Sequence, residues 1–347
     1  MSNTSNIQLK SHSLANDPNK VYQKLSKNHK FEKLPKAKSY ASSDKLRVVC
    51  VSDIFNNTVR LSDTVPKGDV LIINGNFSHD SKWTDIVRFN NTLRDCPPKH
   101  KIFVAGNTDL CFNLDNLDLE QANKCNRDEI RKQLHLLGLQ HVSQYFTELI
   151  YLQDMGVEIC GIKFYGTPWV SAVENAAFHY PRSKIMDKWN QIPRGIDILI
   201  SHMPPLGHGD FNFSSGHIGD VDLFGTVACR LGPRFHIFGH IREGYVISDF
   251  DNKLFISVTQ FGKIGSLVIV RRDVNLAEDS TPVYSVKSLL GKDQAEYHFF
   301  ARHLYESLHL KKQLLFGFAL KSFAKSDLEL VKKFIQTHMK DISCSEP

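Results

Sequence analysis

The sequence has no uninterrupted apolar run of about 18 residues, the length that a membrane-spanning helix requires. Its first residues are polar and lack the apolar core of a secretory signal peptide. The seven cysteines are scattered and form no C-x-x-C pair, which argues against a zinc finger or a disulfide framework. We therefore expect a soluble cytoplasmic protein with reduced thiols and no membrane span.

Acidic residues are scarce at the start of the chain. Nine lysines but only three acidic residues lie between Lys10 and Lys45, within a net charge of +6 for the whole protein. Because residues 1–44 also lack hydrophobic periodicity, we predict that they form a disordered basic tail. A weak tether to acidic partners is the alternative. No nucleic-acid motif accompanies the lysines, so we expect no specific nucleic-acid binding.

From Leu46 onward, short apolar runs alternate with amphipathic segments, which is typical of parallel strands joined by crossover helices. Residues 81–93 have helical spacing, and Ser81 is a candidate N-cap. The apolar runs predict strands at residues 46–51, 70–73, 101–104, 162–165, 196–200 and 235–238, and then antiparallel strands at 254–258 and 266–270.

Five of the predicted parallel strands are followed by a polar residue of the kind that binds metals. These residues are Asp53, Asn76, Asn107, His202 and His240. Because the carboxyl ends of parallel strands lie along one edge of a sheet, we expect these side chains to converge there. Oxygen and imidazole ligands suit a hard or borderline metal ion.

The motifs that carry these residues occur in a recognisable order. They are Asp53-Ile54-Phe55, Gly75-Asn76, Gly106-Asn107-Thr108-Asp109, Ser201-His202-Met203-Pro204-Pro205 and Gly239-His240-Ile241-Arg242. This order resembles the Asp-x-His, Gly-Asp, Gly-Asn-His-Glu, Ser/Thr-His-x-Pro-Pro and Gly-His-x-His series of calcineurin-like metallophosphoesterases. Longer strings at residues 165–169, 187–190, 204–210 and 238–245 look similar to the animal metallophosphoesterase domain-containing proteins. The likeness covers about residues 46–285.

The resemblance implies an α/β (layered α+β) fold with two packed mixed β-sheets flanked by helices. We assign this metallophosphoesterase domain to residues 45–289 and a C-terminal helical extension to residues 290–347. Within the extension, residues 293–316 and 326–339 have helical spacing, and Ser326 and Glu329 match a capping box. The extension either packs on the domain as a helical hairpin or docks a partner.

The family hydrolyses phosphoric esters with two metal ions and a bridging carboxylate. Carried over to this chain, metal site one would consist of Asp53, Phe55, Asn76 and Arg242. Phe55 cannot bind a metal, Asn76 is not a carboxylate, and Arg242 places a permanent positive charge where a dication would sit. Metal site one is therefore expected to be lost, with Asp53 as its remnant.

Metal site two keeps more of the family pattern. Asn76, Asn107, His202 and His240 correspond to its ligands, and three of the four match. This set has no anionic ligand, so we expect one divalent ion (Zn, Mn or Fe) at reduced occupancy, or none. Thr108 stands at the family's proton-donor histidine and cannot act as a general acid near neutral pH. No catalytic residue can therefore be assigned.

The losses suggest a new role for the site. Arg242 could pair with Asp53 or hold a phosphate by a bidentate contact. His208 is either an exposed loop residue or a ligand-facing one. We predict a weak or inactive hydrolase, a pseudoenzyme that binds a phosphorylated small molecule or a protein partner. One alternative is an active phosphodiesterase with a single metal at site two. A second is an adaptor that acts through its tails.

Overall fold

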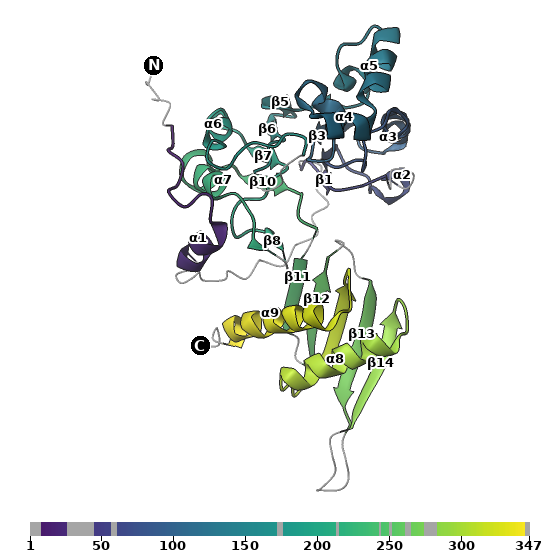
Figure 1. Cartoon of the computed structure of the whole chain (residues 1–347), viewed down its shortest axis with the longest axis vertical. Helices are drawn as coiled ribbons and strands as arrows, with labels where there is room; N and C mark the ends of the chain where they lie inside the picture. Colours follow the sequence, from purple (N-terminus) through teal and green to yellow (C-terminus); the bar gives the residue numbers. More distant parts are fainter. Residues whose placement is uncertain are drawn as a thin grey trace. The chain divides into compact units, whose positions relative to one another are not determined.

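The computed structural model describes residues 8–25, 45–56, 61–171, 176–212, 215–242, 244–249, 252–260, 265–273 and 283–343 (Figure 1). The chain divides into two compact units. Unit 1 comprises Met1–Asp210 and His217–His240, and unit 2 comprises Phe211–Gly216 and Ile241–Pro347. The second unit thus begins well before residue 290, where the sequence alone suggested a boundary.

Unit 1 contains two four-stranded sheets. In the first, β1 (Val48–Val51), β2 (Val70–Asn74), β3 (His100–Val104) and β4 (Ile150–Tyr151) are parallel and adjacent in that order. In the second, β10 (Phe235–Phe238), β7 (Ile198–Ser201) and β6 (Ile162–Thr167) are parallel, and β5 (Met155–Ile159) is antiparallel at the edge. The predicted parallel strands are therefore present, within a few residues of their expected bounds.

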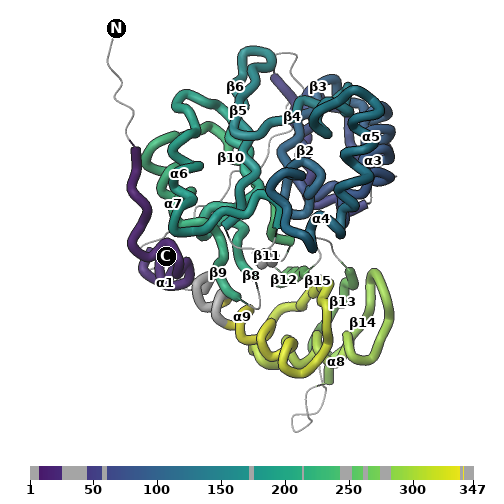
Figure 2. Tube along the Cα trace, turned by 45° about the horizontal axis from the view of Figure 1, so that its top comes forward, coloured from purple at the N-terminus to yellow at the C-terminus, as the bar shows by residue number. Residues whose placement is uncertain are grey.

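The two sheets pack face to face between helices. Alternate residues of β2 face opposite sides of the first sheet. Val70 and Ile72 contact the second sheet, while Leu71 and Ile73 contact the helices. The helices beside the first sheet are α2 (Leu61–Thr64), α3 (Trp83–Asp95), α4 (Leu119–Cys125) and α5 (Arg127–Leu136), and those beside the second are α6 (Met186–Trp189) and α7 (Val221–Thr226) (Figure 2). This layered α/β arrangement confirms the predicted fold.

The start of α3 differs from the sequence prediction. Lys82, not Ser81, is its N-cap, and the Lys82 backbone N–H donates to Asp85. Ser81 has a φ of 55° and its hydroxyl donates to the backbone oxygen of Thr108. The hydroxyl is therefore used to hold the loop that follows β3, and it is not available to the helix.

Unit 2 is a mixed five-stranded sheet covered on one face by two helices (Figure 1). Its strands are β11 (Gly244–Asp249), β12 (Lys253–Thr259), β15 (Gln313–Ala319), β13 (Ser266–Arg272) and β14 (Tyr284–Leu290), in that spatial order, and its helices are α8 (Ala295–Ser307) and α9 (Lys325–Ser343). A short ribbon joins β8 (Phe211–Asn212) to β9 (Gly216–His217).

Two expectations for this unit were wrong. The helix expected at residues 293–316 ends at Ser307, and strand β15 follows, because Leu314, Phe316 and Phe318 alternate into the core with the period of a strand. The capping box at Ser326 is also absent, since α9 already begins at Lys325. The strands at 254–258 and 266–270 exist, but they belong to unit 2.

Part of the N-terminal segment is ordered, contrary to the predicted tail. Residues 8–25 run along unit 1 past α6 and α7 and end in α1 (Pro18–Leu25) (Figure 2). Val21 packs against Leu206 and Val221. The segment is too short to show periodicity in the sequence, and it is held largely by side chains that lie far along the chain. Residues 1–7 and 26–44 lie outside the described residues.

No helix among the described residues combines the length and apolarity that crossing a bilayer requires. The described part of the chain contains six of the seven cysteines, and all six are free.

Candidate functional site

The five polar residues that follow the strands lie together at the carboxyl edge of unit 1. The Asn76 side-chain nitrogen lies 2.8 Å from Asp53 Oδ1 and 2.9 Å from Asn107 Oδ1. The Asn107 oxygen in turn lies 3.0 Å from His202 Nε2 and 3.0 Å from His240 Nδ1. Asn107 is thus the centre of the cluster. Convergence at the sheet edge is what the sequence predicted, whereas metal binding by these residues stays a prediction.

Asn76 is locked in one orientation. The backbone N–H of Thr108 lies 2.9 Å from one terminal atom of the Asn76 amide, and a backbone N–H can only donate. That atom must be the oxygen. The amide NH₂ group therefore faces Asp53 and Asn107. Asn76 thus presents a hydrogen-bond donor to the interior of the site.

Glycines allow this close packing. Gly75 has a φ of 78°, and a Cβ there would lie 2.5 Å from His202 Nδ1. A Cβ on Gly106 would lie 2.4 Å from the Asn76 side-chain oxygen. Both distances are shorter than any van der Waals contact, so the Gly-Asn motifs at these positions reflect a steric requirement of the site.

Asp109 joins the loops that follow β2 and β3. It is fully buried, and its carboxyl group accepts hydrogen bonds from the backbone N–H groups of Asn76, Phe77 and Gly106 at 2.7–3.0 Å. Burial raises the pKa of Asp109 to about 7, although these three bonds oppose the shift. Its role in the structure is to hold Asn76 beside Asn107.

The two histidines of the site are neutral. Burial lowers the pKa of His202, and it lowers the pKa of His240 to about 3, with His202 and Arg182 contributing to the second shift. His202 Nδ1 lies 3.1 Å from the backbone oxygen of Asn74, and its Nε2 faces Asn107. A neutral ring carries one N–H, so only one of these two contacts has a hydrogen. The buried Nε2 of His240 has no hydrogen-bond partner among the residues that the structure describes.

A two-metal centre does not fit these residues. The ring of Phe55 packs 4.7 Å from the ring of His79, at a position where the family has a ligand. Asn76 presents its NH₂ group where the family has a bridging carboxylate. Within the described ranges, no three His, Cys, Asp or Glu side chains are grouped to hold a metal ion. The atoms that remain for one ion are Asn107 Oδ1, His202 Nε2 and His240 Nδ1, all of them neutral.

The remaining predicted site residues differ in their surroundings. Arg242 belongs to unit 2, so its pairing with Asp53 stays a prediction. Asp53 instead accepts hydrogen bonds from Ser52, Asn76 and the backbone of His240. His208 is exposed, and its ring stacks 5.9 Å from the ring of Phe224. Thr108 acts through its backbone N–H on Asn76.

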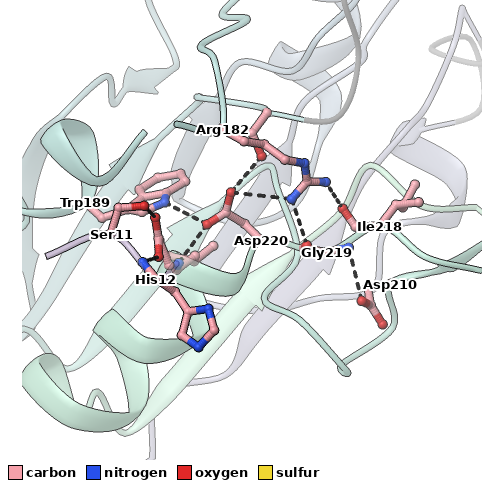
Figure 3. Close-up of polar contacts among 11 residues, drawn as sticks. Ser11, His12, Arg182, Trp189, Asp210, Ile218, Gly219 and Asp220 are labelled. Carbon is pink, nitrogen blue, oxygen red and sulfur yellow. Dashed lines mark hydrogen bonds and ion pairs between the residues drawn. The ribbon is translucent and has the colours of Figure 1, made fainter. Parts of the chain in front are cut away.

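A second polar network, which the sequence analysis did not identify, surrounds Asp220 (Figure 3). The Asp220 carboxylate accepts hydrogen bonds from Trp189 Nε1 at 3.0 Å and from the backbone N–H of Leu223 at 2.8 Å, where it caps α7. Arg182 lies 3.9 Å from Asp220 and donates to the backbone oxygens of residues 218 and 219. Trp189 belongs to residues 187–190, one of the segments on which the family resemblance rests. This segment was the sequence feature that could have pointed to the network.

Comparison with known proteins identifies unit 1. Residues 46–243, more than half of the chain, match the family model described as calcineurin-like phosphoesterase. The chain belongs to the calcineurin-like phosphoesterase family. It is 34% identical over 218 residues to a UPF0046 protein of Caenorhabditis elegans, covering 62% of this chain and 75% of that protein. It is 39% identical over 202 residues to human metallophosphoesterase domain-containing protein 1, covering 57% of this chain and 61% of that protein.

Unit 2 of this phosphoesterase-family chain has a different relationship. Residues 256–338 match the family model of proteasome assembly chaperone 3. The human protein of that name is 30% identical over 94 residues, which is 26% of this chain and 77% of that protein. Unit 2 therefore belongs to the proteasome assembly chaperone 3 family. The C-terminal helical extension of the sequence analysis is the end of this second unit.

Proposed function

We propose that this phosphoesterase-family protein is a cytoplasmic pseudoenzyme that binds a phosphorylated ligand at the Asn107 cluster and hydrolyses it weakly or not at all. The observation that carries the proposal is the orientation of Asn76, whose NH₂ group faces the interior of the site. An amide nitrogen bonded to hydrogen is not a metal ligand, and it cannot bridge two dications.

The same replacement favours an anionic ligand. An amide in place of a bridging carboxylate removes one negative charge from the site. At about 4 Å and an effective dielectric of about 20, one unit charge is worth roughly 4 kcal/mol of repulsion toward a singly charged oxygen. Asp53 remains, and its oxygens already accept three hydrogen bonds. A phosphate would therefore meet less repulsion here than in a site with two carboxylates and no metal.

The purified full-length chain tests this proposal with two probes. Bis(p-nitrophenyl) phosphate in the presence of Mn²⁺ measures hydrolysis, and phenyl phosphate measures binding by calorimetry. We expect binding of phenyl phosphate without turnover of the diester. A matched variant carries Phe55→His, Asn76→Asp, Thr108→His and Arg242→His, and it should gain hydrolysis. Turnover by the unmodified chain at a rate equal to that of the variant would refute the proposal.

A single-metal phosphodiesterase is the competing reading of the same site. Its support is His202, whose two ring nitrogens each face an oxygen although a neutral ring has only one N–H. A cation between His202 Nε2 and Asn107 Oδ1 would remove that conflict, and a bound metal would polarise the phosphate and activate a water molecule. Elemental analysis of the purified chain separates the readings, because this one requires stoichiometric metal.

The family of unit 2 favours a second function, the binding of a protein partner. Phe255, Leu267, Ile269 and Leu315 lie on the sheet face opposite to the helices and are only partly buried. Exposed apolar surfaces of this kind mark sites of protein association. We propose that this face binds a proteasome subunit or a fellow assembly chaperone. The proposed adaptor role would then belong to unit 2 and not to the tails.

Native mass spectrometry with purified proteasome subunits tests this partner. Leu315→Lys should abolish the complex, because it places a charge in the centre of the apolar face. Glu296→Ala, a change at an exposed residue of helix α8 on the other side of the sheet, is the control and should leave the complex intact. If the unmodified chain forms no complex with these subunits, the partner is wrong.

A further inference from the structure

The Asp53 carboxylate has hydrogen-bond donors from the protein itself. Its Oδ2 atom lies 2.5 Å from the Ser52 hydroxyl, which also lies 2.7 Å from the backbone oxygen of Asn74, and it accepts the His240 backbone N–H at 3.1 Å. Its Oδ1 atom accepts the Asn76 amide at 2.8 Å. A half-buried carboxylate left over from a metal site would otherwise be costly to keep. In this chain, hydrogen-bond donors from the protein stabilise the carboxylate.

Asn76 supplies the donor that reaches furthest into the site. One amide N–H is directed at Asp53 Oδ1, and the same nitrogen lies 2.9 Å from Asn107 Oδ1. The Asn76 residue is 2% exposed, so its amide has little contact with water and its hydrogens are directed at these two oxygens. Two oxygens that would each bind a cation in a two-metal centre are thus joined by one NH₂ group.

Thr108 fixes the direction of this bridge. Its backbone N–H and its hydroxyl lie 2.9 Å and 3.0 Å from the Asn76 side-chain oxygen. Rotation of the amide by 180° would place the NH₂ group against the Thr108 N–H, and it would direct the oxygen at the Asp53 carboxylate. Both contacts would then be repulsive, so the bridge has one stable orientation.

We propose that the Asn76 amide, positioned by the Thr108 backbone, takes the structural place of the metal ions and makes the folded site independent of metal. This inference rests on the proposed loss of the two-metal centre. It adds that the loss is compensated within the fold, and that one residue decides whether the site requires metal. The readout is stability, so the result does not depend on whether any phosphate ester binds or is hydrolysed.

Thermal unfolding of the full-length chain in EDTA and in millimolar Mn²⁺ tests the proposal. For the unmodified protein, we expect the two melting temperatures to agree within about 1 °C, because ion binding to the folded state alone would shift them apart. Asn76→Asp replaces the donor by a carboxylate oxygen beside Asp53 Oδ1. We expect its melting temperature in EDTA to fall by about 5 °C or more, as burial of an unpaired charge does. Mn²⁺ should restore at least half of that loss.

Asn90→Asp is the matched control. Asn90 lies on α3 and is also 2% exposed, and within the described part of the chain its side-chain oxygen has no hydrogen-bond partner. The same substitution buries a carboxylate on α3, a helix that contributes none of the site residues. We expect a loss of stability that Mn²⁺ does not restore. Equal recovery of both variants would show a non-specific effect of the ion and would overturn the proposal.

Asn76→Ala keeps the test decisive if Asn76→Asp fails to fold. It removes the donor without adding charge, so it should lower the melting temperature in EDTA and in Mn²⁺ alike. Asn76→Ala with unchanged stability would overturn the proposal, and so would a loss of several degrees when EDTA is added to the unmodified chain. Hydrolysis by the unmodified chain, by contrast, would contradict the proposed function. The melting temperatures alone would still decide whether Asn76 makes the fold independent of metal.

Discussion

At the scale of single residues, burial fixes the protonation state of the histidines around the sheet edge. His236 lies on β10, and its Nε2 atom is 2.7 Å from the hydroxyl oxygen of Ser201, whose hydroxyl donates to the backbone oxygen of Met203. Nε2 therefore carries the hydrogen and donates to Ser201. Burial lowers the pKa of His236 to about 3, and the nearby His208 adds to the shift. His236 is neutral in the folded protein at any moderate pH.

This shift predicts a pH dependence of stability. Because the unfolded chain binds a proton near the ordinary histidine pKa of 6.5 and the folded chain binds it only near 3, the free energy of unfolding should fall as pH decreases below 6.5. One histidine contributes at most about 1.4 kcal/mol per pH unit. His236→Gln keeps a donor toward Ser201 and removes the titration. Urea unfolding between pH 7 and pH 5 should show a smaller slope for this variant, and an unchanged slope would contradict the assignment.

At the scale of elements, the N-terminal segment is attached to the rest of unit 1 by contacts with side chains from distant parts of the chain. The backbone N–H of His12 and the hydroxyl of Ser11 donate to Asp222 at 2.7 Å and 2.6 Å. The Tyr22 ring stacks 3.5 Å from the ring of His217. Helix α1 has only eight residues, and isolated helices of that length are marginal in water. Its order therefore depends on these tertiary contacts.

Asp222→Ala should release the beginning of this segment. Loss of two hydrogen bonds to a carboxylate, each worth about 1.5–3 kcal/mol, should raise amide exchange at His12 by roughly tenfold or more. Hydrogen exchange with mass spectrometry measures this. Asp187→Ala, which removes an exposed acidic residue of α6, is the control and should leave the exchange unchanged. Equal exchange in both variants would show that Asp222 does not hold the segment.

At the scale of the whole molecule, the chain joins two families with separate hydrophobic cores. Leu71 lies in a core of unit 1 and Leu314 in the core of unit 2, and both are fully buried. We therefore expect each unit to unfold as a cooperative structure of its own.

The same substitution in each core tests this division. Leu71→Ala and Leu314→Ala should each cost about 2–5 kcal/mol, which includes the cavity left behind. We expect calorimetry of the full-length chain to show that each variant lowers mainly the transition of its own unit. If both variants lowered one common transition equally, the two units would form a single cooperative structure.

Much of unit 1 follows from its sequence. Strand β10 occupies the predicted residues, and β3 begins one residue before its predicted start, because a continuous apolar run between turn residues identifies a buried parallel strand. The convergence of Asp53 and Asn107 also follows, since both come after parallel strands of one sheet. His240 follows β10 of the second sheet, so its approach to them depends in addition on how the two sheets pack. In unit 2 the sequence contained an unused signal, the alternation of Leu314, Phe316 and Phe318 in β15.

By itself, the sequence determined the family of unit 1, its layered sheets and the residues that meet at the sheet edge, because motif order and apolar runs are local properties. Only the tertiary structure decided what those residues do to one another. The direction of the Asn76 amide depends on a backbone N–H 32 positions later in the chain, and the order of residues 8–25 depends on Asp222. Interactions between groups so far apart in sequence leave no local pattern, and they exist only once the chain is folded.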